Sequence, residues 1–163
     1  QIAELCAIAS PTIGIVTNVG TSHIGILGSQ ENIAKAKAEL IEALPKDGTA
    51  ILNGDDPFVK AMGDSFEGRV ISYGLAGRYT VRGTDARYEA SQTQFICTSF
   101  DEAFRVKLHL LGVHNVYDAL AAIAAARVLG VVSGRHCLPS QGSPSWMTRT
   151  MRIRSPWKWH SAR

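Results

Sequence analysis

The first half of the chain alternates between short apolar runs and longer segments of mixed polarity. Three runs rich in β-branched side chains each predict a strand, and they cover residues 11–19, 49–53 and 69–73. The run at 11–19 is apolar over most of its length, which is typical of a strand buried on both faces of a parallel sheet.

The segments between these runs predict helices at residues 30–44 and 55–66. The first is rich in Ala, Lys, Glu and Leu, and Ser29 stands where an N-cap is expected. Pro57 lies near the start of the second, where proline is tolerated. Strand, helix and strand in alternation with short links predict an α/β sheet with right-handed crossovers.

The pattern changes after Gly77, where short, partly alternating segments indicate a β-meander or an antiparallel extension. Four strands are expected there, at residues 79–83, 86–91, 94–98 and 104–110. An Ala-rich helix then follows at 114–129 and ends at Gly130. We therefore expect an α/β domain over residues 1–131, with a mostly parallel sheet, flanking helices and a β-meander extension.

Residues 132–163 show neither the two-residue alternation of a strand nor the spacing of three to four residues of a helix. They contain all three Trp, six Lys or Arg, and no Asp or Glu. We hypothesise that this irregular basic tail comes from a frameshifted or misassembled gene, and the alternative is a disordered basic tail. The formal charge of +3 belongs to the tail, because the preceding residues carry more acidic than basic side chains. Because the excess of basic side chains lies only in the tail, it gives no reason to expect that the domain binds nucleic acid.

Neither apolar runs nor cysteines point to a membrane or a secreted protein. No apolar run approaches the roughly 18 residues of a membrane-spanning helix, and no signal peptide is visible. Cys6, Cys97 and Cys137 form no CxxC pair and no zinc spacing. We expect idle, buried thiols in a cytoplasmic protein, with no membrane partner.

Generic motifs are absent: there is no P-loop, G-x-G-x-x-G or G-x-S-x-G sequence. Residues 18–40 are more informative, because a strand there leads into a Gly-containing loop, and open α/β sheets bind ligands at that edge. His23 lies in this loop, and an imidazole can bind a metal there. Lys35 and Lys37 are two positions apart on the next helix, so one can face the cleft and the other water.

The segment TNVGTSHIGILGSQENIAKAKAEL closely resembles the central domain of the Mur ligase family, especially its D-alanyl-D-alanine-adding members. AILNGDDP and GVHNVYDALAAIAAARVLGV resemble later family segments in the same order, so the likeness covers residues 1–131. It implies that His23 binds Mg²⁺ and that a carbamylated Lys37 supports a second Mg²⁺. A carbamate offers the hard anionic oxygens that Mg²⁺ prefers, whereas an amine does not.

The resemblance also implies that ATP is bound near Asn53, Asn115 and Asp118. Asn115 matches the family pattern, but Asp118 stands where Asn is common, and a carboxylate cannot donate a hydrogen bond as an amide does. The other interpretation of Asn115 is a helix N-cap.

The implied reaction is ATP-dependent amide formation in cell-wall synthesis. ATP would phosphorylate the terminal carboxylate of UDP-MurNAc-tripeptide, and the amine of D-alanyl-D-alanine would attack the acyl phosphate. The P-loop and the acidic Mg²⁺ ligand of the family lie outside this sequence, as do its other two domains. We therefore expect the fragment alone to lack ligase activity and to bind ATP weakly.

Other functions remain open at this point. Another Mur enzyme or a folylpolyglutamate synthase-like ligase is the first alternative, and the latter usually has Asp where Ser22 stands. A non-catalytic nucleotide-binding or interaction domain is the second. A nucleic-acid binder acting through the basic tail is the third.

Overall fold

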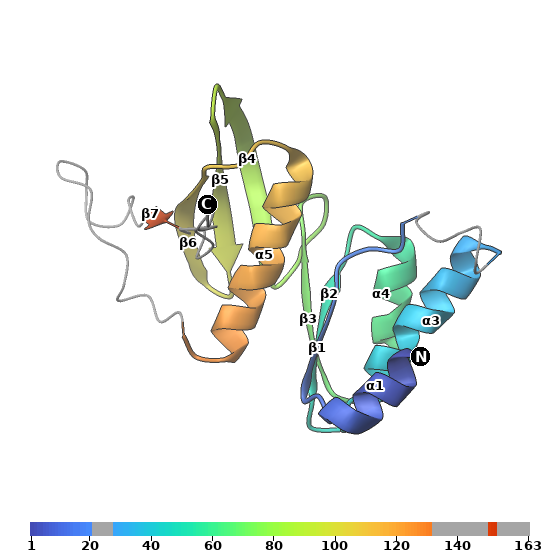
Figure 1. Ribbon diagram of the computed structural model, residues 1–163. Helices are drawn as coiled ribbons and strands as arrows, with labels where there is room; N and C mark the ends of the chain where they lie inside the picture. Colours follow the sequence, from blue (N-terminus) through green and yellow to red (C-terminus); the bar gives the residue numbers. More distant parts are fainter. Residues whose placement is uncertain (21–27, 132–149, 153–163) are drawn as a thin grey trace, which may run out of the picture.

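The computed structural model describes residues 1–20, 28–131 and 150–152, which build one seven-stranded sheet in chain order (Figure 1). Its strands are β1 (Ile13–Val16), β2 (Thr49–Asn53), β3 (Arg69–Gly74), β4 (Val81–Glu89), β5 (Gln92–Ser99), β6 (Glu102–Leu108) and β7 (Thr150–Arg152). The helices are α1 (Ile2–Ala9), α3 (Gln30–Glu42), α4 (Pro57–Asp64) and α5 (Val113–Val128).

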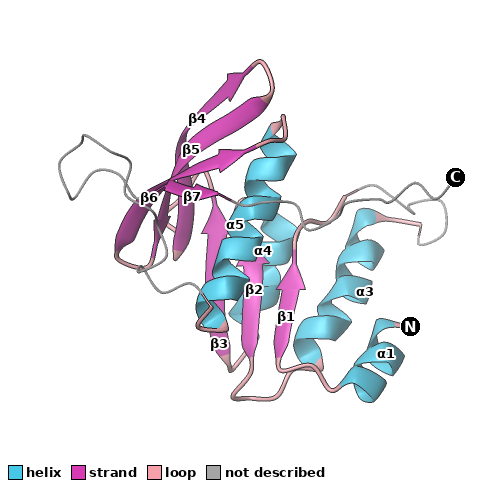
Figure 2. Cartoon of the chain, turned by 60° about the vertical axis from the view of Figure 1, so that its left-hand side comes forward, coloured by secondary structure: helices cyan, strands magenta, loops and turns pink. Residues whose placement is uncertain are grey.

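The first three strands are parallel, and β2 at their centre is buried on both faces. Ile51 of β2 lies opposite Ile15 of β1 and Ile71 of β3. Because side chains alternate along a strand, Ile51 and Tyr73 belong to the core under α5, whereas Leu52 belongs to the core under α3 and α4. Figure 2 shows these helices on opposite sides of the sheet. The predicted α/β architecture is thereby confirmed.

Local signals explain where the helices begin. Ser29 Oγ accepts a hydrogen bond from Asn32 N at 3.3 Å, so Ser29 is the expected N-cap of α3. At α4, Asp56 Oδ1 accepts from the backbone N–H groups of Phe58 and Val59, and Pro57 occupies the first turn as predicted.

The helix α5 joins the parallel and antiparallel halves of the sheet. Its buried residues form a broad stripe in which positions 116, 120 and 124 follow one another at intervals of four, as expected of a helix that covers one core. They are Val116, Ala119, Leu120, Ala121, Ile123 and Ala124. The same core includes Tyr73 of β3 and Phe95 of β5, so α5 packs across the boundary between the two halves.

The antiparallel extension has three strands, not four. The segments predicted at 79–83 and 86–91 are parts of the single strand β4, which pairs with β5 on both sides of a bulge between Thr84 and Arg87. Asp85 has a φ of +53° within this bulge. An extra residue reverses the alternation of side chains, which made one strand look like two.

The strand predicted at 11–19 is shorter and less buried than expected. Only Ile13–Val16 is extended, and Ile15 is 39% exposed. In the described ranges β1 pairs with β2 alone, so its other edge is open. The backbone of the following residues bonds to side chains, which ends the ladder at Val16.

Two elements were not predicted, α1 and β7. In α1 only Cys6 is buried, while Leu5 and Ile8 are 64% and 83% exposed, so there is no amphipathic stripe to recognise. The strand β7 lies in the segment expected to be irregular and pairs with the edge of β6, whose backbone groups can accept any extended segment. A domain boundary at residue 131 stays a prediction.

Cys6 and Cys97 are buried free thiols, as expected, and burial raises the pKa of Cys97 to about 12. Cys137 lies outside the described residues. In the ranges that the structure covers, no helix combines the length and apolar character needed to cross a bilayer.

Candidate functional site

The candidate site is the edge of the sheet where β1, β2 and β3 end. The chain after β1 is held there by side chains that follow β2. Asn53 Nδ2 donates to Thr17 O at 2.8 Å, and Asp56 Oδ2 accepts from Val19 N at 2.7 Å. These bonds satisfy backbone groups that have no sheet partner, and so they fix the start of the predicted ligand loop.

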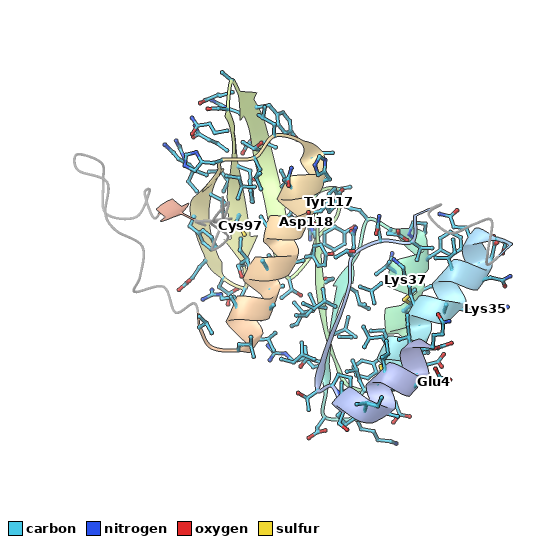
Figure 3. The ribbon with its side chains drawn as sticks, viewed as in Figure 1. Glu4, Lys35, Lys37, Cys97, Tyr117 and Asp118 are labelled. Atoms are coloured by element: carbon cyan, nitrogen blue, oxygen red, sulfur yellow. The ribbon has the colours of Figure 1, made fainter. Side chains whose placement is uncertain are left out.

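Lys37 extends from α3 toward this edge, where its Nζ donates to Asn18 O at 2.6 Å. Lys35 is exposed, and Figure 3 shows the two side chains on different sides of α3. The two lysines point to different sides of α3, as predicted, and Lys37 is the one that reaches the strand end, whereas a cleft at Lys37 stays a prediction. The role of Lys37 as a carbamylated Mg²⁺ ligand stays a prediction, and His23 lies outside the described residues.

Asn53 is 7% exposed, and both ends of its amide are occupied. While Nδ2 binds Thr17 O, Oδ1 accepts from Asp55 N at 3.0 Å. The side chain therefore ties the end of β1 to the turn after β2. A direct contact of Asn53 with ATP stays a prediction.

Asn115 and Asp118 lie in the first two turns of α5. The N-cap is Gly112, and Asn115 stands within the helix, so the interpretation of Asn115 as the cap is wrong. Gly112 has a φ of +112°, which glycine adopts without strain, and it starts the helix earlier. Asn115 Nδ2 donates to Leu111 O at 2.8 Å, while Asp118 is exposed (Figure 3).

The sequence did not indicate that Asp55 would be a centre of hydrogen bonding. Its Oδ2 accepts from Leu75 N at 2.6 Å and from the Tyr117 hydroxyl at 2.9 Å. Its Oδ1 accepts from the Tyr79 hydroxyl at 2.7 Å and from Ala76 N at 3.2 Å. The only signal was a second acidic residue after Asn53, because the cap of α4 requires Asp56 alone.

Ionisation of these groups follows from their contacts. Burial opposes the charge of Asp55, but its four donors outweigh that effect and hold the pKa below its ordinary value. Burial, together with the hydrogen bond to Asp55, raises the pKa of Tyr79 and of Tyr117 to about 12. Burial also raises the pKa of Tyr73, and the charges of Asp118 and Asp56 add to the shift. The Tyr73 hydroxyl is buried without a hydrogen-bond partner.

Metal-binding side chains do not cluster in the part of the chain that the structure covers, where no three His, Cys, Asp or Glu residues form a group. The described surface has hollows that are not lined by the predicted site residues Lys37, Asn53, Asn115 and Asp118. One, of about 320 Å³, is lined by Arg87 and Arg105 of the meander. Another, of about 490 Å³, lies between α3 and α4 beside Lys35 and Phe58.

Comparison with known proteins shows the family of this chain. Residues 1–126 match the model of the Mur ligase middle domain. The UDP-N-acetylmuramoyl-tripeptide–D-alanyl-D-alanine ligase of Synechocystis is 45% identical over 132 residues. That alignment covers 80% of this chain and 27% of the relative, so the chain spans about a quarter of its length.

Solved structures agree with this match. MurF from Acinetobacter baumannii superposes with a TM-score of 0.75 at 29% identity, covering 82% of this chain and 29% of that one. The MurF ligase of Thermotoga maritima in complex with ADP has a TM-score of 0.72 at 27% identity and covers 79% of this chain and 30% of that one. The chain belongs to the Mur ligase family, and residues 1–126 correspond to its middle domain.

Proposed function

We propose that this chain is the middle-domain part of an ATP-dependent ligase that joins D-alanyl-D-alanine to UDP-MurNAc-tripeptide through an acyl phosphate in peptidoglycan synthesis. The observation that carries the proposal is the similarity at 45% identity to a ligase of that name. The geometry supports it, because Lys37 lies at the ligand-binding edge of the sheet.

The two halves of the edge suit different parts of a nucleotide. Lys37 and the backbone of residues 17–20 form the half suited to phosphates, whereas Asn115 and Asp118 form the half suited to adenine. Asn115 can donate and accept through its amide, but Asp118 only accepts, which suits an amino group such as that of adenine. The chain's own residues would bind and orient ATP at this edge.

We propose that Mg²⁺ would neutralise phosphate oxygens when bound at this edge. The described side chains include no group of three His, Cys, Asp or Glu, so the proposal depends on modification of Lys37, whose Nζ lies at the strand end and donates to Asn18 O at 2.6 Å. A carbamate on Nζ would add the anionic oxygens that an ammonium lacks. We propose His23 as a further ligand on the resemblance alone.

A chimera tests the proposal. The corresponding segment of the Synechocystis ligase is replaced by residues 1–131, and ligation of D-alanyl-D-alanine to UDP-MurNAc-tripeptide is measured. We expect activity, and a loss of at least about 100-fold with Lys37→Ala, because oriented charge stabilisation typically contributes that much. The matched control is Lys35→Ala, which changes an exposed lysine two positions away and should retain activity.

A folded chimera that uses L-alanine or glutamate in place of D-alanyl-D-alanine would favour another member of the ligase group. A folded chimera without any ATP-dependent ligation would contradict the proposed function. Equal losses from Lys37→Ala and Lys35→Ala would remove the assigned role of Lys37 while leaving the ligase assignment in place.

A further inference from the structure

Hydrogen bonds, joined through the residues Asn53 and Asp55, connect the two halves of the candidate edge. The series begins at Thr17 O after β1, passes through the amide of Asn53, and continues from Asn53 Oδ1 to the backbone N–H of Asp55. The Asp55 carboxylate then accepts from the Tyr117 hydroxyl of α5 at 2.9 Å. The residue after Tyr117 is Asp118, so this series runs from the strand end beside Lys37 to the adenine-side candidates.

The carboxylate of Asp55 is itself held in one position. Its Oδ1 accepts from the hydroxyl of Tyr79, whose ring lies against Gly54, Gly74 and Gly77. A Cβ atom on Gly74 or on Gly77 would approach the Tyr79 ring to 2.6 Å, so the ring needs glycine at these positions. Because Leu75 N also donates to Oδ2, the carboxylate presents a fixed acceptor to Tyr117.

The apolar contacts of α5 do not fix its position as tightly. Val116 and Leu120 are fully buried and hold the helix on the sheet. Apolar packing has no direction, whereas a hydrogen bond to a charged acceptor sets both distance and angle. Tyr117, labelled in Figure 3, provides such a directed contact between the N-terminal half of α5 and the turn after β2.

We propose that Asp55 is a positioning residue which, through Tyr117, sets the distance between the phosphate side and the adenine side of the nucleotide site. This inference rests on the proposed function, because it takes α5 to contact the nucleotide. Asp55 and Tyr117 themselves need no contact with the ligand.

A matched pair of variants tests the inference on the 163-residue chain. Tyr117→Phe and Tyr79→Phe each remove one hydroxyl from the same carboxylate, but only Tyr117 belongs to α5. Melting temperature is measured for both, and amide hydrogen exchange of residues 117–121 is followed without ligand. ADP is then titrated into ¹⁵N-labelled protein, because chemical shifts detect weak binding.

Tyr117→Phe is expected to speed exchange in this segment of α5 about tenfold and to weaken ADP binding by about threefold to tenfold, since a hydrogen bond to a charged group is lost. Tyr79→Phe should lower the melting temperature to a similar extent, yet change the exchange in α5 and the ADP affinity by less than about twofold, because the backbone N–H groups of Leu75 and Ala76 still hold the Asp55 carboxylate. A difference between two variants of equal stability identifies positioning, because a purely structural role affects both alike.

Two failures can be told apart. If ADP perturbs α5 in the parent chain but both variants bind it equally well, the positioning role of Asp55 is wrong and the nucleotide site stands. If ADP perturbs no residue of α5 in the parent chain, the proposed nucleotide site is wrong, and the positioning role is overturned with it.

Discussion

The two ends of α5 are attached to the sheet by different chemistry. At the N-terminal end, the neutral hydroxyl of Tyr117 donates to the Asp55 carboxylate. At the C-terminal end, the cation of Arg127 donates to Glu102 Oε2 at 2.9 Å and to Ser99 O at 3.0 Å. The guanidinium of Arg127 also lies 5.6 Å from the centre of the Phe100 ring.

These two attachments connect α5 to different parts of the sheet. Asp55 connects α5 to the ends of the parallel strands, where the candidate site lies. Arg127 connects α5 to the turn between β5 and β6, away from the candidate residues. We infer from this difference that the apolar middle of α5 contributes most of the stability of the helix, whereas the contacts at its two ends set its position on the sheet. Three predictions test this division.

The largest effect is expected from the middle of the helix. Leu120 is fully buried, so Leu120→Ala should lower the free energy of unfolding by about 2–5 kcal/mol through the lost contacts and the cavity left behind. Denaturant unfolding measures it. The control is Leu129→Ala, at a side chain that is 63% exposed, which should change stability by less than about 0.5 kcal/mol. Similar losses for both variants would contradict the assignment of stability to the middle.

A smaller effect is expected from the C-terminal attachment. The Arg127 side chain is 13% exposed, and Arg127→Ala removes donors to Glu102 and Ser99. We expect a loss of about 1–3 kcal/mol in chemical denaturation, as for hydrogen bonds that involve a charge. Lys46→Ala is the control, since its ion pair with Glu67 is exposed on both sides and should contribute about 0–1 kcal/mol. ADP binding by the Arg127 variant should be unchanged, which separates this end from the Asp55 end.

The smallest effect is a pH dependence at the N-terminal attachment. The folded state raises the pKa of Tyr79 and of Tyr117 from 10.0 to about 12, so it favours their protonated forms. The stability that this provides is fully present below pH 10.0 and is lost as the pH rises to about 12. Urea unfolding at several alkaline pH values should show this loss. In the double variant Tyr79→Phe and Tyr117→Phe the slope should be shallower, and an unchanged slope would assign the loss to other groups.

Several features of the fold were predictable because their causes are local. The strand at 49–53 has the predicted bounds, Ser29 caps α3 by a bond within one turn, and Pro57 occupies the first turn of α4. The bulge in β4 was not predictable in this way. Whether an interruption near Asp85 ends a strand or bends it depends on β5, which continues to pair on both sides.

The candidate site shows the same limit. The separation of Lys35 from Lys37 follows from helical geometry, so the sequence alone predicts that the two side chains point to different faces of the helix. The hydrogen bonds of the Asp55 carboxylate could not be predicted, because its partners are 20 to 62 positions away in the chain. A hydrogen bond between such distant residues depends on the packing of β3 and α5, which no local pattern encodes.

Periodicity, capping and local motifs were enough to predict the α/β class, three of the helices with the start of α3, and the family likeness, and they suggested the candidate residues from Asn18 to Asp118. Only the tertiary structure decided that β1 is a half-exposed strand, that α5 begins before Asn115, and that Asp55 joins three segments of the chain. The physical reason is that burial and hydrogen-bond partners belong to the packed arrangement, in which residues far apart in the chain satisfy one another.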